Sequence, residues 1–232
     1  MTTKTIGQIV AEDFRTAKVF EKHGIDFCCG GEITLVEACK AKGVSLEAMG
    51  AELTTEKETP LDRSQNFGSW TLPFLADYIV NTHHTYLREN TASIIEYTQK
   101  IARVHGEGHP ELVQIADTFQ KIATAMTAHL QEEEEILFPV IKRIEASKKE
   151  GKQAAAEDMN LLEKTLNGVS REHQEIGDAT HTIRHLSHDY SVPADGCNSY
   201  KVAFKMLKEF EDDLHKHVHL ENNILFMKAG RK

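Results

Sequence analysis

The sequence predicts an all-α protein in which a small helical N-terminal domain precedes an up-down-up-down four-helix bundle. Four long stretches repeat apolar residues at helical spacing, and short polar breaks separate them. The 232 residues include only five prolines and one tryptophan, which is unusual for a loop-rich β protein. Short connections make successive helices antiparallel, and a bundle lets four such helices bury their apolar faces together.

Residues 1–56 form the predicted N-terminal domain. Its first apolar residues recur at helical spacing and predict one helix, which Gly24 ends; they are Ile6, Ile9, Val10, Phe14, Ala17 and Phe20. A glycine-rich turn leads to a short helix that ends at Gly43, and Ser45 is the expected N-cap of a third. Such a small unit buries little apolar surface, so we expect it to dock elsewhere or to form a homodimer.

Residues 57–70 are the predicted interdomain linker, because the sequence around them is polar, contains Pro60 and Gly68, and has no apolar period. Residues 71–232 are the predicted bundle. Its helices are expected to run from about Leu72 to Arg103, from Pro110 past Pro139, from Leu161 to His188 and from Tyr200 to Phe226. Proline lacks a backbone donor, so a kink is expected at Pro139.

Composition and charge argue against several classes of partner. Acidic residues outnumber basic ones 36 to 27, which disfavours binding to nucleic acid or to an anionic membrane. No stretch has the roughly 20 apolar residues of a membrane helix, and we expect no signal peptide. The four cysteines, two of them adjacent, do not resemble a disulfide framework. The sequence therefore predicts a cytoplasmic protein with reduced thiols.

Histidine and glutamate interrupt the apolar seam, which is the stripe of each bundle helix that faces the interior. Seam positions follow alternating steps of three and four residues, and every helix has a histidine in this series. Two helices have a glutamate one turn later. The histidines and glutamates of the seam, here called the polar seam residues, are His84, His129, Glu133, His173, His217 and Glu221. On the second helix the series continues after Glu133 with Ile136 and Val140. Buried carboxylates need a partner of high positive charge, which a pair of metal ions in the bundle interior would supply.

An internal repeat supports a two-metal centre. HLQEEEEILF at 129–138 and HVHLENNILF at 217–226 share His, Glu, Ile, Leu and Phe at the same spacing. Iron or manganese suits a site of imidazoles and bridging carboxylates better than zinc does. If both glutamates bridge, each metal keeps an open position, and on ferrous iron such a position reacts with O2 or NO.

Simpler interpretations compete with the metal site. A single core histidine is more often structural than a ligand, and the run Glu132–Glu135 is mostly a solvated face from which only Glu133 points inward. Helical spacing barely separates His83 from His84. Three further histidines share a face outside the seam, where exposed residues are a better interpretation than a second metal site: His181, His185 and His188.

The adjacent Cys28 and Cys29 are the other candidate for chemistry. Two glycines follow them, and backbone N–H groups near a helix start would lower a thiol pKa and give a reactive thiolate. The pair would then pass iron or react with NO. The simpler interpretation is two small buried residues in a turn. Cys39 and Cys197 are predicted to be structural.

At these motifs the C-terminal part resembles the hemerythrin-like family, and the whole chain resembles the iron–sulfur cluster repair di-iron proteins of the RIC or ScdA group. The matching segments are DFCCGGEITLVEAC, HHTYLRE, HLQEEEEILFP, REHQEIG and HLENNILF. Two departures are Met227, where a proline is expected, and a long connection over residues 148–160. The resemblance implies that the six polar seam residues hold two non-haem iron ions bridged by carboxylate and oxo groups. It also favours His84 over His83, because an arginine, Arg88, follows four residues later.

The resemblance further implies the repair of iron–sulfur clusters damaged by nitrosative or oxidative stress, most directly by donating iron. Damaged iron–sulfur proteins would be the partners, and NO and O2 the small ligands. Cys28 and Cys29 would handle iron or NO. Two alternatives belong to other classes: a di-iron nitric oxide reductase that makes N2O, and a non-enzymatic NO or O2 binder.

Overall fold

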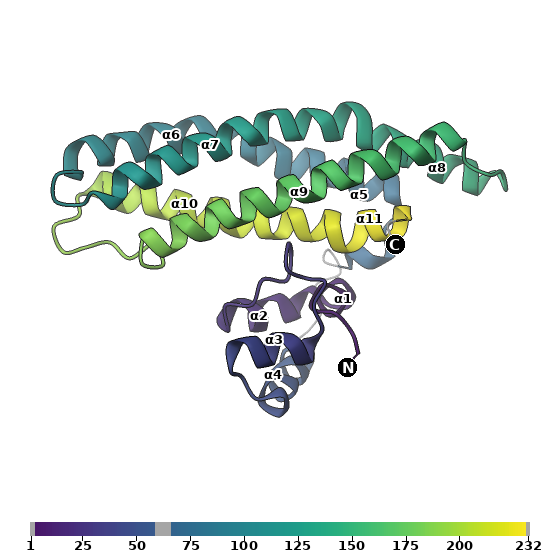
Figure 1. Cartoon of the computed structure of the whole chain (residues 1–232), viewed down its shortest axis with the longest axis horizontal. Helices are drawn as coiled ribbons and strands as arrows, with labels where there is room; N and C mark the ends of the chain where they lie inside the picture. Colours follow the sequence, from purple (N-terminus) through teal and green to yellow (C-terminus); the bar gives the residue numbers. More distant parts are fainter. Residues whose placement is uncertain (1–2, 59–65, 231–232) are drawn as a thin grey trace.

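The computed structural model describes residues 3–58 and 66–230. The regular elements of this described part are helices, and one isolated bridge joins Thr5 to Thr34. Residues 72–229 form four long helical rods joined by short connections. Figure 1 shows these rods lying side by side and antiparallel, with the N-terminal domain against one side of them. The all-α fold and the four-helix bundle are thereby confirmed.

The N-terminal domain contains four short helices rather than the predicted three. They are α1 (Ile6–Glu12), α2 (Ala17–Lys22), α3 (Leu35–Lys42) and α4 (Leu46–Glu58). The prediction of one uninterrupted first helix is wrong, because Asp13 is extended and its carboxylate caps the N–H of Arg15 at 3.2 Å. Gly24 and Gly43 adopt positive φ angles of 62° and 66° after their helices. Ser45 accepts the N–H of Ala48 at 3.4 Å, as expected of an N-cap.

Only part of the predicted linker 57–70 lies within the described residues, because 59–65 are outside them. Its first residues complete α4, and Phe67–Ser69 form a 3-10 turn. Phe67 is buried, and its ring lies 5.0 Å from that of Trp70 and 5.8 Å from that of Phe14. The end of this segment is therefore packed between the N-terminal domain and the bundle. The domain boundaries stay a prediction.

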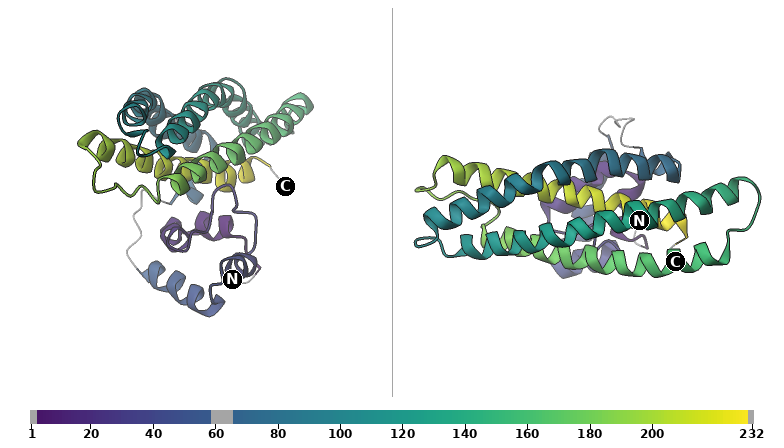
Figure 2. Two further views of the ribbon diagram at one scale, coloured as in Figure 1. Left: turned by 60° about the vertical axis from the view of Figure 1, so that its left-hand side comes forward. Right: turned by 90° about the horizontal axis from the view of Figure 1, so that it is seen from above.

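Three of the four bundle helices contain a π-helical turn, and the third long helix has none in the described residues. The first comprises α5 (Leu72–Ile79), η4 (Val80–His84) and α6 (Thr85–His105); the second comprises α7 (Glu111–Glu132), η5 (Glu133–Leu137) and α8 (Phe138–Lys149). The third is α9 (Ala156–Leu186), and the fourth comprises α10 (Asn198–His219), η6 (Leu220–Leu225) and α11 (Phe226–Ala229). Figure 2 shows the rods in an oblique view and from above.

The π-helical turns shift which residues face the interior. A π turn inserts one residue into the helix, so the side chains after it rotate relative to an uninterrupted seam. Ile136, which the unbroken seam places inside, is 39% exposed, whereas Leu137 is 0% exposed. The prediction for Ile136 is therefore wrong. Pro139 lies in the first turn of α8, directly after η5, and the kink expected there stays a prediction.

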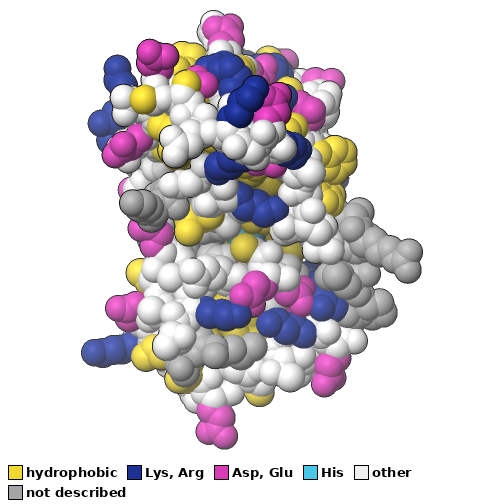
Figure 3. Space-filling view, turned by 90° about the vertical axis from the view of Figure 1, so that its right-hand side faces the viewer, with side chains coloured by type: hydrophobic (Ala, Val, Ile, Leu, Met, Phe, Trp, Pro, Cys, Tyr) yellow, Lys and Arg dark blue, Asp and Glu magenta, His cyan; other side chains and the backbone are white. Residues whose placement is uncertain are grey.

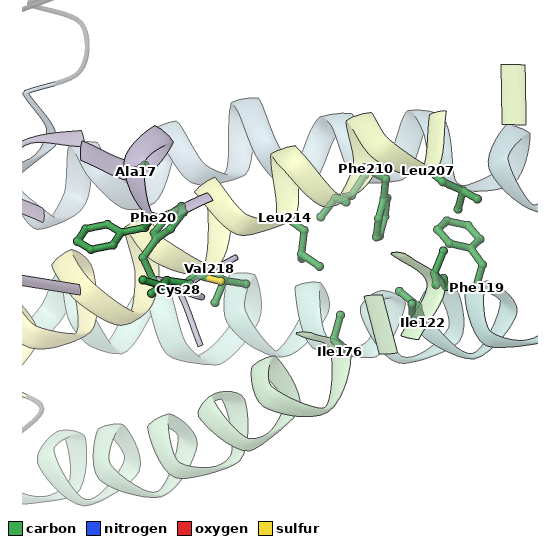
Figure 4. Packing of buried hydrophobic residues seen from close by; sticks show 14 of the residues in the cluster. Ala17, Phe20, Cys28, Phe119, Ile122, Ile176, Leu207, Phe210, Leu214 and Val218 are labelled. Carbon is green, nitrogen blue, oxygen red and sulfur yellow. The ribbon is translucent and has the colours of Figure 1, made fainter. Parts of the chain in front are cut away.

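Two apolar clusters make up the core, and the polar seam residues lie between them. On every bundle helix the chain passes from one cluster to the other near its histidine and glutamate seam residues; on α9, for example, Val169 belongs to one cluster and Ile176 to the other. The larger cluster also includes the N-terminal domain. Figure 4 shows Phe20 and Cys28 of that domain beside Val218 of α10. The domain therefore docks on its own bundle.

The described surface carries charges of both signs. On the end of the molecule seen in Figure 3, lysine and arginine side chains lie among aspartate and glutamate side chains. None of the helices in residues 3–58 and 66–230 combines the length and the apolar character needed to cross a membrane.

Candidate metal centre

The structure brings all six polar seam residues together in the middle of the bundle. Two groups of potential ligands share both carboxylates, and the ligand atoms within each group lie within 4.8 Å of one another. The groups are His84, Glu133, His217 and Glu221, and His129, Glu133, His173 and Glu221. This arrangement matches two adjacent cation sites with two shared carboxylates, as the repeat in the sequence predicts.

The nitrogens in each group are close enough to share one ion. The Nε2 atoms of His84 and His217 are 3.1 Å apart, and those of His129 and His173 are 3.0 Å apart. Glu221 reaches both groups, with Oε1 at 3.0 Å from His217 Nε2 and Oε2 at 3.2 Å from His173 Nε2. Glu133 Oε2 is 3.5 Å from both His84 Nε2 and His129 Nε2. Each carboxylate thus lies between the two histidine pairs.

Burial and electrostatics show why this cluster suits a cation. The six residues are at most 2% exposed, and all four carboxylate oxygens of Glu133 and Glu221 lack a hydrogen-bond partner among the described residues. Burial and the nearby Glu221 charge raise the pKa of Glu133 well above its usual value. Burial lowers the pKa of His217 to about 4, which keeps this imidazole neutral. Neutral imidazoles and orphaned carboxylates are the ligand set that a divalent cation satisfies.

Hydrogen bonds orient three of the four imidazoles. His84 Nδ1 is 2.7 Å from Glu134, and His129 Nδ1 is 2.8 Å from Glu172. His173 Nδ1 is 3.2 Å from the side-chain oxygen of Asn222. A proton held on Nδ1 leaves the Nε2 lone pair directed at the centre. The described residues offer no such partner to His217 Nδ1.

Two of these orienting residues were missed or misplaced by the sequence reasoning. Glu134 was assigned to a solvated face, but it bonds His84 and also pairs with Arg88 at 2.8 Å. That prediction is wrong because η5 changes the helical register at Glu133. Glu172 was not singled out, although its place directly before the seam residue His173 was the available signal.

The structure separates the roles of His83 and His84. Only His84 belongs to the candidate ligand groups within the described residues. His83 is also buried, but its Nδ1 lies 2.9 Å from Asp213, and its ring stacks on that of His217 at 5.7 Å. His83 therefore supports a candidate ligand from outside the centre.

The adjacent cysteines lie against the bundle beside the centre. Cys29 Sγ is 3.2 Å from the backbone oxygen of His173, and it packs on Gly177 of the same helix. Asn223 of η6 holds the cysteine turn by donating its side-chain amide to the backbone oxygen of Phe27 at 3.1 Å. The turn is thus anchored to two helices that carry candidate ligands.

The prediction of a lowered thiol pKa is wrong for Cys28. The Asp26 carboxylate accepts the backbone N–H groups of Cys28, Cys29 and Gly30 at 2.8–3.1 Å, so these donors are not available to a thiolate. A hydrogen bond with the Cys29 thiol, burial and the Asp26 charge instead raise the pKa of Cys28 well above its usual value. Cys28 is therefore a neutral thiol in this structure.

The remaining cysteines differ from each other. Cys39 is buried in the N-terminal domain, which agrees with a structural role. Cys197 is exposed at the N-cap of α10, and the structural role predicted for it stays a prediction. A hydrogen bond with His105, 3.2 Å away, lowers the pKa of Cys197 to about 7.

His219 was not recognised as an interface residue from its spacing. Its ring is fully buried and lies 5.5 Å from the ring of Phe27 and 5.8 Å from that of Phe14. Burial lowers the pKa of His219 to about 3, so it docks the N-terminal domain as a neutral ring.

Two glycines of α9 test how closely the cysteine turn is docked. A Cβ atom at Gly177 would lie 3.1 Å from Cys29 Sγ, whereas one at Gly168 would meet nothing within 4 Å. Gly168→Ala is expected to stabilise the protein by up to about 1 kcal/mol through helix propensity. Gly177→Ala is expected to be about 1–3 kcal/mol less stable than Gly168→Ala, because it overpacks the interface. Urea unfolding of both variants measures the difference, and equal gains would contradict the docking of Cys29 on Gly177.

Comparisons with known proteins cover nearly the whole chain. Residues 2–57 match the family model ScdA_N, described as "Domain of Unknown function (DUF542)". Residues 75–229 match the model Hemerythrin, described as "Hemerythrin HHE cation binding domain". The second match contains all six candidate ligands.

Curated relatives share both parts. An "Iron-sulfur cluster repair protein ScdA" of Staphylococcus haemolyticus is 31% identical over 225 residues, which are 96% of each chain. The protein of that name from Staphylococcus epidermidis is 29% identical and covers 97% of each chain. An "Iron-sulfur cluster repair protein YtfE" of Yersinia pestis is 29% identical over 98% of this chain and 97% of its own.

Proposed function

Because this chain belongs to the hemerythrin HHE cation-binding family and, over nearly its whole length, to the iron–sulfur cluster repair proteins, we propose that it repairs damaged iron–sulfur clusters by donating iron. The names of the relatives indicate the process, which is cluster repair, and the buried centre offers a place where the iron for this process can bind. The observation that carries the proposal is the convergence of four imidazoles and two buried carboxylates whose oxygens lack a hydrogen-bond partner among the described residues.

The proposed centre holds two iron ions. One ion would be bound by His84 and His217, the other by His129 and His173, and both would share Glu133 and Glu221. Bound there, iron supplies redox chemistry and an open position for a small ligand such as NO or O2. The protein's part is to keep Nε2 of each histidine directed inward and the surroundings dry, which Glu134, Glu172 and Asn222 and the two apolar clusters support.

Iron held in this way is suited to transfer. Imidazole and carboxylate ligands bind ferrous iron less firmly than the thiolates of a cluster do, and protonation of a histidine removes a ligand. Cys28 and Cys29 lie on the side of α9 next to His173, and we propose that they handle iron that leaves the centre. The raised pKa of Cys28 means that iron has to displace a thiol proton before this sulfur can bind it.

Three accompanying features belong to the same proposal. NO and O2 are the expected small ligands of the open positions. We also propose a cytoplasmic location, which would keep the thiols reduced. Homodimerisation stays a prediction, and its physical motive is weaker because the small domain docks on its own bundle.

Isotope transfer tests this function. Protein loaded with 57Fe is incubated without oxygen with an iron–sulfur enzyme whose cluster NO or peroxide has damaged. We expect 57Fe to enter the client cluster, detected by Mössbauer spectroscopy, and the client's activity to return. His129→Ala should abolish the transfer, and Cys28→Ser with Cys29→Ser should slow it, whereas Cys39→Ser is the matched thiol control.

Two results would overturn the proposal. Equal recovery with His129→Ala would show that the centre is not the source of the iron. Steady N2O production from NO by the reduced protein, without any 57Fe transfer, would support a nitric oxide reductase instead.

A further inference from the structure

A cavity of about 690 Å³ lies between the N-terminal domain and the bundle, outside the two-metal centre. The domain contributes Asp26 and Phe27 from the cysteine turn. The bundle contributes the three histidines that share a face of α9, together with His215 of α10: His181, His185, His188 and His215. The histidine face that the seam leaves unexplained therefore lines a cavity that is open to solvent, and His185 and His188 are exposed, as the sequence predicts.

Two of these histidines converge on a buried carboxylate. The ligand atoms of His181, Glu211 and His215 all lie within 4.8 Å of one another. The rings of His181 and His215 are 6.0 Å apart, and His215 Nε2 is 3.9 Å from Glu211 Oε1. Zinc–ligand bonds of about 2.0–2.2 Å need ligand atoms roughly 3.3 Å apart, so a small approach of the two rings completes the geometry.

Glu211 is held in place and still has capacity to bind. Its Oε2 accepts the Tyr190 hydroxyl at 2.7 Å and an Arg184 N–H at 2.9 Å. Its Oε1 accepts one bond from Arg184, at 3.1 Å, and is the oxygen nearest His215. Hydrogen bonds of this kind orient a ligating carboxylate and leave a lone pair of Oε1 for a cation.

The inner ring nitrogen of His215 makes no hydrogen bond within the described residues. Its Nε2 is buried without a hydrogen-bond partner in the described part of the chain. A buried polar atom without a partner is costly, and a cation at this point would remove the cost.

The charge around the cavity favours a cation despite Arg184. Carboxylates of Glu21, Asp26 and Asp189 line the cavity with the bases Arg184 and Lys42. Glu211 adds a further negative charge against the wall. Acidic groups therefore outnumber basic ones where the cation would bind.

We propose that His181, Glu211 and His215 form a third, mononuclear site for a divalent cation of borderline softness, such as Zn²⁺ or Fe²⁺. Two imidazoles and one carboxylate leave at least one coordination position, and that position faces the cavity. Asp26, whose carboxylate accepts a hydrogen bond from the Cys28 thiol, lines the same cavity as His181 and His215. It is independent of the two-metal centre and does not depend on cluster repair.

Zinc binding to the full-length, iron-loaded protein tests this site. The protein is dialysed against rising free Zn²⁺, and zinc and iron per chain are measured by mass spectrometry. We expect one zinc to bind while the iron content stays constant. His181→Gln and His215→Gln should weaken this binding at least tenfold, more than the loss of an orienting hydrogen bond commonly costs a metal site.

His185→Gln is the matched control, because His185 lines the same cavity but lies outside the ligand group. It should bind zinc like the unsubstituted protein. Circular dichroism and iron content show whether each variant keeps its fold and its centre. Absence of a bound zinc, or equal losses in His181→Gln and His185→Gln, would overturn the third site.

Discussion

Removal of both metals is expected to lower the free energy of unfolding by about 3–5 kcal/mol at neutral pH, the usual cost of leaving a buried charge unpaired. Glu133 and Glu221 would then share a dry interior in which their oxygens lack a hydrogen-bond partner among the described residues. Urea unfolding of loaded and chelator-treated protein measures the difference. An unchanged midpoint and slope would mean that the carboxylates are satisfied without a cation.

The Glu133→Gln variant separates the effect of the buried charge on stability from the effect of losing the metal. The amide keeps the shape of the side chain but carries no charge, so the metal-free variant is expected to be more stable than the metal-free unsubstituted protein. The loaded proteins should show the opposite order, since the amide is a poor bridging ligand. A metal-free Glu133→Gln protein that is less stable would show that packing, not charge, dominates at this position.

The stability difference between the metal-free Glu133→Gln variant and the metal-free unsubstituted protein is expected to depend on pH with a definite sign. Burial and the Glu221 charge raise the pKa of Glu133 above its usual 4.5, so the folded state keeps a proton that the unfolded state has released. Stability of the unsubstituted protein therefore falls as pH rises above 4.5, until the raised pKa is passed. Glutamine does not titrate, and the advantage of Glu133→Gln should grow from about pH 5 to pH 8. An advantage that shrinks over this range would contradict the raised pKa.

The sequence predicts the bundle and the convergence of its six polar seam residues for one reason. A residue at a seam position of a long amphipathic helix has to face the interior, and four such helices meet there. His173 shows this most simply, because α9 has no π-helical turn and all its predicted seam residues are buried. The site follows from periodicity wherever the helix stays regular.

The π-helical turns could not be predicted from periodicity. A single inserted residue leaves the steps of three and four intact in the sequence but rotates the side chains after it, so Leu137 replaces Ile136 inside. The same shift brings Glu134 within reach of His84. Each π turn lies at or beside candidate ligands, as is common at functional sites.

The docking of the N-terminal domain on the bundle could not be predicted from periodicity either. Residues two apart on a helix point in different directions, so periodicity places His217 in the seam and assigns no partner to His215 and His219. In the structure all three side chains are in contact with other parts of the protein, because α10 and η6 face the bundle interior on one side and the small domain on the other. A helix buried on two sides gives no single apolar stripe from which its second partner can be inferred.

His84→Ala is expected to disrupt the metal centre, while His83→Ala leaves it loaded. His84 places Nε2 within 3.1 Å of His217 Nε2, and its Nδ1 is fixed by Glu134. Loss of this ligand should weaken metal binding more than the roughly 10–100-fold that results from losing an orienting hydrogen bond. Iron per chain, measured by mass spectrometry, should fall from about two toward one or none, and the absorption of a bridged ferric pair should disappear.

His83→Ala is the matched comparison, because the two histidines are adjacent and almost equally buried. It removes the contact with Asp213 and the stacking on His217, but no candidate ligand. The variant should keep its iron and lose part of its stability, by about 2–5 kcal/mol as for other large-to-small core substitutions. Because both substitutions leave a similar cavity, a loss of iron confined to His84→Ala must come from ligation. Iron lost from His83→Ala and retained by His84→Ala would instead make His83 the ligand and require the first helix to rotate by one residue.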